Sequence, residues 1–195
     1  MTSKSLLAIV RGGRIDNVSP NDGRSYAQVR GLLKYLAYGS YAETLGQEPG
    51  QRGIWLDQKG QSHSHQAVRQ WAKESVHRLG YEHAYQLLLS TRFGGLSAAD
   101  FNQVLQKGSS LSQVLEWRFM IHEDTDNQHA HAILFRQEKL NKAQYRAWQQ
   151  TMQYELGQRQ REQQTLEQQE TLELNQSVEG SQDQSQHLDR MLDYV

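Results

Sequence analysis

The sequence predicts an α+β protein in which an antiparallel sheet is flanked by helices. Short apolar runs of strand length alternate along the chain with stretches whose apolar residues recur at helical spacing. Two of these runs, 115–122 and 130–136, are separated by a seven-residue polar connection, which is typical of a hairpin. We therefore expect this hairpin at the centre of the sheet, with the first helix lying across its functional residues.

Local patterns predict the other elements of the domain. Apolar residues at positions 29, 32, 33 and 36 form one stripe of a helix that begins near Tyr26. Ser97 and Asp100 have the spacing of a helix cap, with Asp100 in the place that Glu fills in a capping box. The remaining expectations are a strand at 5–10 closed by Gly12 and Gly13, a helix at 64–79, a strand at 85–90, a helix from 97 to about 106, and a long helix from about 141.

The C-terminal part of the chain differs in composition from the rest. Nine of the 22 acidic residues but only three of the 21 basic residues lie after Thr151, which gives a net charge of +5 before that position and −6 after it. Beyond Gly157 the sequence is mostly Gln and Glu with sparse leucines, and such a segment cannot bury enough apolar surface to order itself. We expect a domain over 1–157 and an extension over 158–195, helical to about 174 and disordered from 176.

Composition excludes several classes of protein. No apolar run approaches the roughly 18 residues that a membrane span requires, and the N-terminus lacks the order of charged and apolar residues found in signal peptides. The chain has no cysteine, which excludes disulfides and thiolate chemistry. These features predict a cytoplasmic protein without membrane insertion, and the basic domain is compatible with a polyanionic ligand.

Three histidines around the predicted hairpin form a candidate metal site. Side chains two apart on a strand share a face, so His129 and His131 lie side by side, and His122 at the end of the preceding strand can supply a third nitrogen. Three neutral imidazoles leave positions open for water or substrate. The alternative is that they are solvent-facing histidines of a polar hairpin, which is how we interpret His63 and His65 in the polar run GQSHSHQ.

The stretch HEDTDNQHAHA, from His122 to Ala132, resembles motif III of the P-class conjugative relaxases, which belong to the HUH endonucleases. The order of two further motifs agrees with that family. The segment GLLKYL, with Tyr35, resembles motif I, and LLLSTR, with Ser90, resembles motif II. The resemblance covers roughly residues 5–150 and leaves out the Gln-rich extension.

The resemblance implies a metal-dependent enzyme that nicks and rejoins single-stranded DNA. In that family a tyrosine forms a 5′-phosphotyrosine bond, which assigns the nucleophile to Tyr35, with Tyr38 as the alternative. On a helical wheel Tyr35 lies at the edge of the apolar stripe, whereas Tyr38 points into solvent. The histidines would hold Mg²⁺ or Mn²⁺, although imidazoles also accept softer metals. Asp124 is the candidate for the base that activates the tyrosine or for a group that orients a ligand histidine.

The same resemblance implies a set of DNA contacts and partners. Ser90 would touch DNA beside the nick, and basic side chains would bind phosphates. The expected substrate is the transfer origin of a bacterial plasmid, with accessory relaxosome proteins and a type IV secretion coupling protein as further partners. The basic candidates are Arg24, Arg30, Lys34, Arg92 and Arg118.

Two other functions are compatible with the sequence. A rolling-circle replication initiator or a single-tyrosine transposase would carry its nucleophile after the histidine hairpin, at Tyr145 or Tyr154. A single-stranded-DNA-binding module with a structural metal would not carry a nucleophile. The early position of the Leu-Lys-Tyr35 segment and the motif order favour the relaxase arrangement.

Overall fold

A computed structural model describes residues 8–15, 23–39, 52–77, 79, 81–91, 95–112, 116–122 and 127–192. Six strands in this part of the chain form one antiparallel sheet in the order β1-β4-β6-β5-β2-β3. The β5–β6 hairpin lies at the centre, as the sequence predicts. The strands are β1 (Ala8–Ile15), β2 (Trp55–Asp57), β3 (Ser62–His63), β4 (His83–Thr91), β5 (Trp117–His122) and β6 (His129–Arg136).

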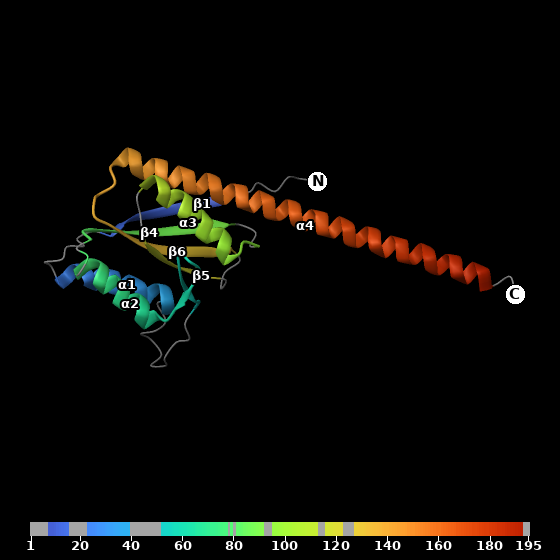
Figure 1. The fold of residues 1–195 in the computed structure, drawn as a ribbon, viewed down its shortest axis with the longest axis horizontal. Helices are drawn as coiled ribbons and strands as arrows, with labels where there is room; N and C mark the ends of the chain where they lie inside the picture. Colours follow the sequence, from blue (N-terminus) through green and yellow to red (C-terminus); the bar gives the residue numbers. More distant parts are fainter. Residues whose placement is uncertain are drawn as a thin grey trace. The chain divides into compact units, whose positions relative to one another are not determined.

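Helices cover both faces of the sheet. α1 (Gly23–Tyr38) and α2 (His65–His77) lie on one side, and α3 (Ala98–Ser112) and the first part of α4 (Lys142–Leu192) lie on the other (Figure 1). The predicted class, an antiparallel sheet flanked by helices, is therefore confirmed. None of these helices is both long enough and apolar enough to cross a membrane.

Alternation along β6 separates two hydrophobic cores. Ala130, Ala132 and Leu134 face α3 and α4, whereas Ile133 and Phe135 pack with the buried residues of α1 and α2. Because the side chains of a strand point alternately to either face, one strand can serve both layers only if both of its faces are apolar. This requirement explains the nearly continuous apolar sequence AHAILF.

β1 is longer than expected. The sequence predicts that Gly12 and Gly13 close the strand, yet it continues to Ile15 and pairs with β4 throughout. A Cβ atom at Gly12 would lie 2.4 Å from the carbonyl oxygen of Gln86, so only glycine fits here. The glycine thus permits a close approach of two strands instead of ending one of them.

The cap of α3 is confirmed. The Ser97 hydroxyl accepts a hydrogen bond from the Asp100 amide (3.2 Å), and the Asp100 carboxylate accepts one from the Ser97 amide (2.9 Å). The helix then runs six residues beyond the predicted end, to Ser112. Gly108, which favours an earlier end, lies so close to Met152 and Trp148 of α4 that a side chain would clash there.

The chain divides into two compact units, Met1–Gln160 and Arg161–Val195. Residues 176–192 are helical, which differs from the predicted disorder. Gln and Glu have good helix propensity. Hydrogen bonds between side chains four residues apart also support the helix, such as the one from the Gln163 side-chain amide to the Glu167 carboxylate (3.3 Å). The second unit presents exposed Leu166, Leu172 and Leu174 among acidic side chains.

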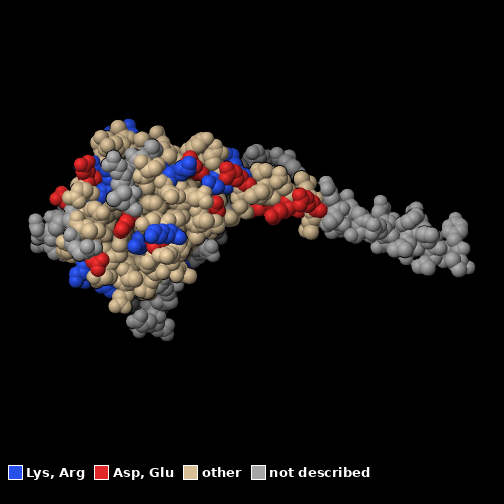
Figure 2. Space-filling model, in the orientation of Figure 1, with Lys and Arg blue, Asp and Glu red and all other residues tan. Residues whose placement is uncertain are grey.

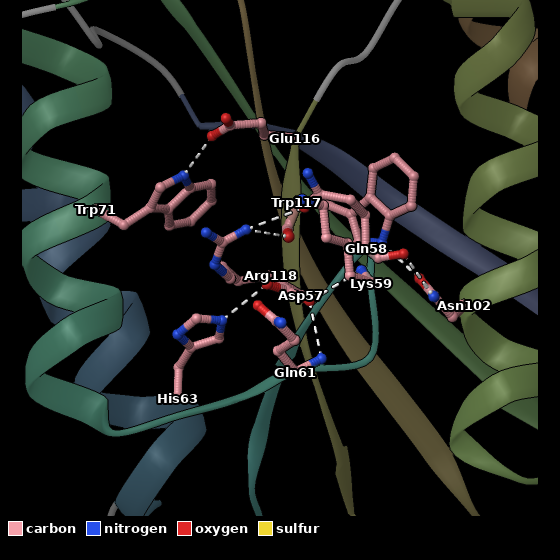
Figure 3. Close-up of polar contacts among 10 residues, drawn as sticks. All are labelled: Asp57, Gln58, Lys59, Gln61, His63, Trp71, Asn102, Glu116, Trp117 and Arg118. Atoms are coloured by element: carbon pink, nitrogen blue, oxygen red, sulfur yellow. Dashed lines mark hydrogen bonds and ion pairs between the residues drawn. The ribbon is translucent and has the colours of Figure 1, made fainter.

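The β2–β3 hairpin is held by a buried carboxylate. Asp57 is 6% exposed and accepts hydrogen bonds from the backbone amides of Lys59 (2.8 Å) and Gln61 (2.9 Å), and it also bonds His63 Nε2 at 2.9 Å (Figure 3). His63 is therefore a half-buried strand residue, and its interpretation as a surface residue was wrong. The sequence hid this contact because its partner is on the other strand of the hairpin.

The turn of this hairpin is tied to helices on both faces of the sheet. Arg118 donates to the Gln58 side chain (3.2 Å) and lies 4.7 Å from the centre of the Trp71 ring on α2. Asn102 on α3 donates to the Gln58 carbonyl oxygen (2.9 Å) (Figure 3). These contacts hold the edge of the sheet, where β3 has only two residues.

We predict that Asp57→Asn lowers the free energy of unfolding at pH 6 by about 1–3 kcal/mol, because three hydrogen-bond donors lose their charged, buried acceptor. Burial acts to raise the pKa of Asp57, but the hydrogen bonds from His63, Gln61 and Lys59, together with nearby Arg118, outweigh it and hold the pKa below its ordinary value. The stabilisation is complete above the unfolded-state pKa of about 3.9 and is lost as the pH falls through the lower folded-state pKa.

Urea unfolding at a series of pH values between 6 and 2.5 checks this prediction. The difference between wild type and Asp57→Asn should shrink on acidification, whereas Glu138→Gln, at an exposed position, should match wild type throughout. A difference that grows as the pH falls would contradict the assigned role of Asp57.

Candidate metal centre

The central hairpin brings three histidines together. His122 and His129 are directly paired across β5 and β6, and His131 is paired with Met120, so all three side chains project from one face. Their ring centres lie 5.1–5.3 Å apart, and one nitrogen from each ring lies within 4.8 Å of the others. The predicted triad is thus assembled, and it could hold a metal ion.

A hydrogen bond identifies the nitrogen through which His129 could bind a metal. His129 Nδ1 lies 2.9 Å from the backbone carbonyl oxygen of Asn127. A carbonyl oxygen only accepts, so Nδ1 carries the hydrogen and Nε2 keeps the lone pair that a metal requires. Such a contact also fixes the ring orientation, as it does in known metal sites. The sequence shows Asn127 two residues before His129, but it does not show that the Asn127 backbone carbonyl accepts a hydrogen bond from the His129 ring.

The start of β6 is fixed by a second contact. The Gln128 carbonyl oxygen accepts a hydrogen bond from the Thr91 amide (3.0 Å), and its side-chain oxygen accepts one from the Leu96 amide (3.2 Å). Gln128 thereby ties the histidine strand to the end of β4 and to the segment before α3. The backbone on which His129 stands is therefore held from two sides.

The three ligands differ in their access to solvent. His122 is fully buried, whereas His129 and His131 are partly exposed. The residues that would hold an ion are therefore accessible to solvent on the side of His129 and His131. Open coordination positions are typical of catalytic rather than structural metal sites, and a donor set of three imidazoles suits first-row transition metals better than Mg²⁺, which prefers oxygen ligands.

The residues around the triad belong to the face that α1 covers. Ser90 is paired with His129 across β4 and β6, which places its partly buried side chain beside that imidazole. Met120, which is paired with His131, packs in the core formed with α1 and α2. The predicted motif II serine and motif III histidines therefore lie side by side.

The last turn of α1 is linked to the histidine end of β5. Gly39 ends the helix with a positive φ of 73°, and the Arg52 amide donates to the Ala37 carbonyl oxygen (2.8 Å). A Cβ atom at the next residue, Gly53, would lie 2.5 Å from the Ile121 carbonyl oxygen. Through Arg52 and Gly53 the end of α1 is thus connected to the residue before His122.

The two candidate tyrosines of α1 have different environments. Tyr35 is 52% exposed, so its ring leans on the core less than the wheel predicts. Tyr38 does not point into solvent: it is half-buried and meets the His65 ring edge-on at 5.0 Å. A helical wheel describes α1 alone, so it does not predict the contact of Tyr38 with the first residue of α2. Burial, and then nearby Arg69, lower the pKa of His65.

The downstream candidates lie on the other side of the sheet. Tyr145 packs in the core that α3 and α4 share, with its ring 6.3 Å from Tyr85, and burial raises its pKa. Tyr154 is exposed on α4 and accepts a hydrogen bond from Gln158. Because the histidines face α1 and α2, the position of Tyr145 argues against the replication-initiator arrangement.

The side chains predicted to bind DNA lie in different surroundings. Arg30 and Lys34 are exposed on α1, whereas the Arg118 guanidinium is held in the network with Trp71 and Gln58. On the face drawn in Figure 2, Lys and Arg side chains lie singly among acidic and uncharged residues. The other expected site residues, Asp124, Arg92 and the side chain of Arg24, lie outside the described residues.

Comparisons with protein-family models, curated proteins and solved structures gave no significant match. The chemistry of this centre is therefore interpreted from its own residues and geometry.

Proposed function

We propose that this chain is a metal-dependent DNA strand transferase that nicks single-stranded DNA with Tyr35, in the manner of the HUH relaxases that its motifs resemble. One observation carries the proposal: the three histidines lie on the sheet face covered by α1, and the end of α1 is connected to the strand of His122. A metal centre and an exposed tyrosine hydroxyl on neighbouring elements are the two parts that phosphodiester transfer requires.

The proposed step exchanges one phosphodiester for another. The Tyr35 oxygen attacks the phosphorus, the bond to the 3′ oxygen breaks, and the tyrosine proton ends on the released 3′-hydroxyl. A divalent ion held by His122, His129 and His131 would neutralise charge on the phosphoryl oxygens. Asp124 remains our candidate for accepting the tyrosine proton. Because the bonds broken and formed are alike, the step is reversible and requires no nucleotide cofactor.

In this proposal Ser90, Arg30 and Lys34 position the strand. Ser90 is next to His129 in the sheet and would hydrogen-bond a phosphate oxygen close to the reacting one. Arg30 and Lys34, one turn apart on α1, would hold phosphates of the flanking nucleotides. The substrate we propose is a plasmid transfer origin, with relaxosome and type IV secretion proteins as partners.

Capture of a covalent adduct tests the proposal. The full chain is incubated with Mn²⁺ and single-stranded oligonucleotides whose central segment is randomised, labelled at either the 3′ or the 5′ end. A 5′-phosphotyrosine retains the 3′ segment, so only the 3′ label should remain with the protein in detergent, and EDTA should abolish it. Sequencing the captured strands identifies the nick site.

The other outcomes contradict the proposal. Retention of the 5′ label would indicate the opposite polarity of cleavage. Binding of the oligonucleotides without any adduct, in the presence of Mn²⁺, would favour the non-catalytic DNA-binding module.

A further inference from the structure

A cavity lies on the face of the sheet opposite the histidines. It has a volume of about 530 Å³ and opens between β1, β4 and the start of α4. This size is within the range of small-molecule sites. Tyr85 and Tyr145 belong to the core shared with α3 and α4, which places the cavity away from the proposed metal centre. Its main lining residues are Gly12, Arg14, Tyr85, Lys139, Lys142 and Tyr145.

The space exists because β1 carries a glycine there. Gly12 and Arg14 are paired with Leu87 and Tyr85 of β4, so these four residues share one face of the sheet. A side chain at Gly12 would occupy the floor of the cavity, and its Cβ atom would already clash with Gln86 and Leu87. The fold of β1 therefore keeps this space open.

The rim of the cavity is basic. Arg14, Lys139 and Lys142 come from β1 and from the approach to α4, and all three side chains are exposed. The positive charge of this rim also affects nearby His83. Burial lowers the pKa of His83, and the charges of Arg14, Lys139 and Arg136 lower it further, whereas Glu82 raises it. The positive end of the α4 helix lies at the same rim. An anion is the ligand that this charge favours.

The wall of the cavity is aromatic. The Tyr85 hydroxyl already accepts the Leu140 amide at 2.9 Å. The Tyr145 hydroxyl is buried and has no hydrogen-bond partner within the described part of the chain. Burial, followed by the effect of Tyr85, raises the pKa of Tyr145, which keeps the hydroxyl neutral and able to donate. Because the Tyr145 hydroxyl is shielded from solvent, the part of this wall that a ligand can reach is the partly exposed ring of Tyr145.

We propose that this cavity binds a nucleoside phosphate, with the base against the Tyr145 ring and the phosphate between Lys139 and Lys142. Bases bind aromatic side chains through their π-faces, and phosphates bind clustered cations, so one ligand satisfies both halves of the cavity. The nucleoside phosphate is either a free nucleotide or one unit of a single strand. The inference goes beyond the strand-transfer proposal, because it uses none of the residues of the metal centre.

Equilibrium dialysis of the full chain with dAMP tests the inference. EDTA is present throughout, so that no ion at the histidines can capture the phosphate. Deoxyadenosine and inorganic phosphate serve as half-ligands, and both should bind at least about tenfold more weakly than dAMP, because each fills only one half of the cavity. A short oligothymidylate is then added as competitor: displacement of dAMP indicates a unit of a single strand, and no displacement indicates a free nucleotide.

Charge reversal and removal of the aromatic ring locate the site. The double variant Lys139→Glu/Lys142→Glu, at exposed positions, should weaken dAMP binding by about tenfold or more. Tyr145→Leu removes the ring against which the base would stack and should weaken dAMP binding by about fivefold or more, whereas Tyr145→Phe keeps the ring and should bind dAMP as wild type does. Lys107→Glu on α3 reverses an exposed charge away from the cavity and should bind dAMP as wild type does.

Three results would overturn the inference: no binding of dAMP, binding no tighter than that of inorganic phosphate, or binding that the double variant leaves unchanged. Failure here with adduct formation retained would leave the strand-transfer proposal intact. Binding of dAMP by a chain that forms no adduct with any oligonucleotide would overturn the strand-transfer proposal alone.

Discussion

Tyr35→Phe is expected to eliminate the covalent protein–DNA adduct while leaving the fold and DNA binding intact. The substitution removes the attacking oxygen, and loss of a nucleophile lowers turnover by about 10³-fold or more. The ring stays in place, and more than half of it is exposed, so the free energy of unfolding should change by no more than about 0.5 kcal/mol. Adduct yield is measured with the 3′-labelled oligonucleotides, and DNA binding is measured by fluorescence anisotropy.

Tyr38→Phe is the matched control for this experiment. It removes the same oxygen three residues later on α1 and keeps the ring that packs against His65. We expect wild-type adduct formation from it. The reverse result, with loss in Tyr38→Phe and activity in Tyr35→Phe, would move the nucleophile along the helix. Activity in both variants, with loss only in Tyr145→Phe, would favour the replication-initiator arrangement.

His131→Ala is expected to abolish both metal binding and adduct formation. Removing even an outer partner of a metal ligand costs 10–100-fold in affinity, so loss of a ligand should weaken Mn²⁺ binding by more than about 100-fold. His131 is partly exposed at the open side of the triad, and alanine is tolerated on such a strand face. Calorimetric titration with Mn²⁺ measures the affinity, and urea unfolding monitors the fold.

His77→Ala provides the control, because His77 is exposed on α2 and does not belong to the triad. It should bind Mn²⁺ and form adduct as wild type does. Wild-type affinity for Mn²⁺ in His131→Ala would exclude this histidine as a ligand. Loss of cooperative unfolding in His131→Ala would instead identify the metal as a structural one.

The sequence predicted the centre of the sheet better than its edges. Alternation around His129 and His131, together with the strand before His122, was enough to place three imidazoles on one face, because strand periodicity is a local property. The capping box of Ser97 and Asp100 was equally readable. In both cases the residues that interact are close in the sequence or repeat at a fixed interval.

The errors arose where a residue's role depends on contact with another element. Gly12 was predicted to end a strand, but it allows β1 to pack closely against β4. Tyr38 was predicted to face solvent, but its ring packs against His65 of α2. His63 lay in a run of polar residues whose role depends on Asp57, a buried acceptor on a neighbouring strand. Such contacts depend on tertiary packing, which local patterns do not record.

The register of β6 gives the metal centre a dependence on faithful folding. A slip of one residue against β5 would turn His129 and His131 toward α3 and α4 and send Ala130 and Ala132 to the imidazole face. Ile133, Leu134 and Phe135 would still supply apolar side chains to both faces of the slipped strand, so general compactness would be a poor guide to correct assembly. Affinity for a divalent ion is therefore a sensitive measure of native strand alignment. We expect variants in either core that loosen this alignment to bind the ion more weakly under conditions in which they are still folded.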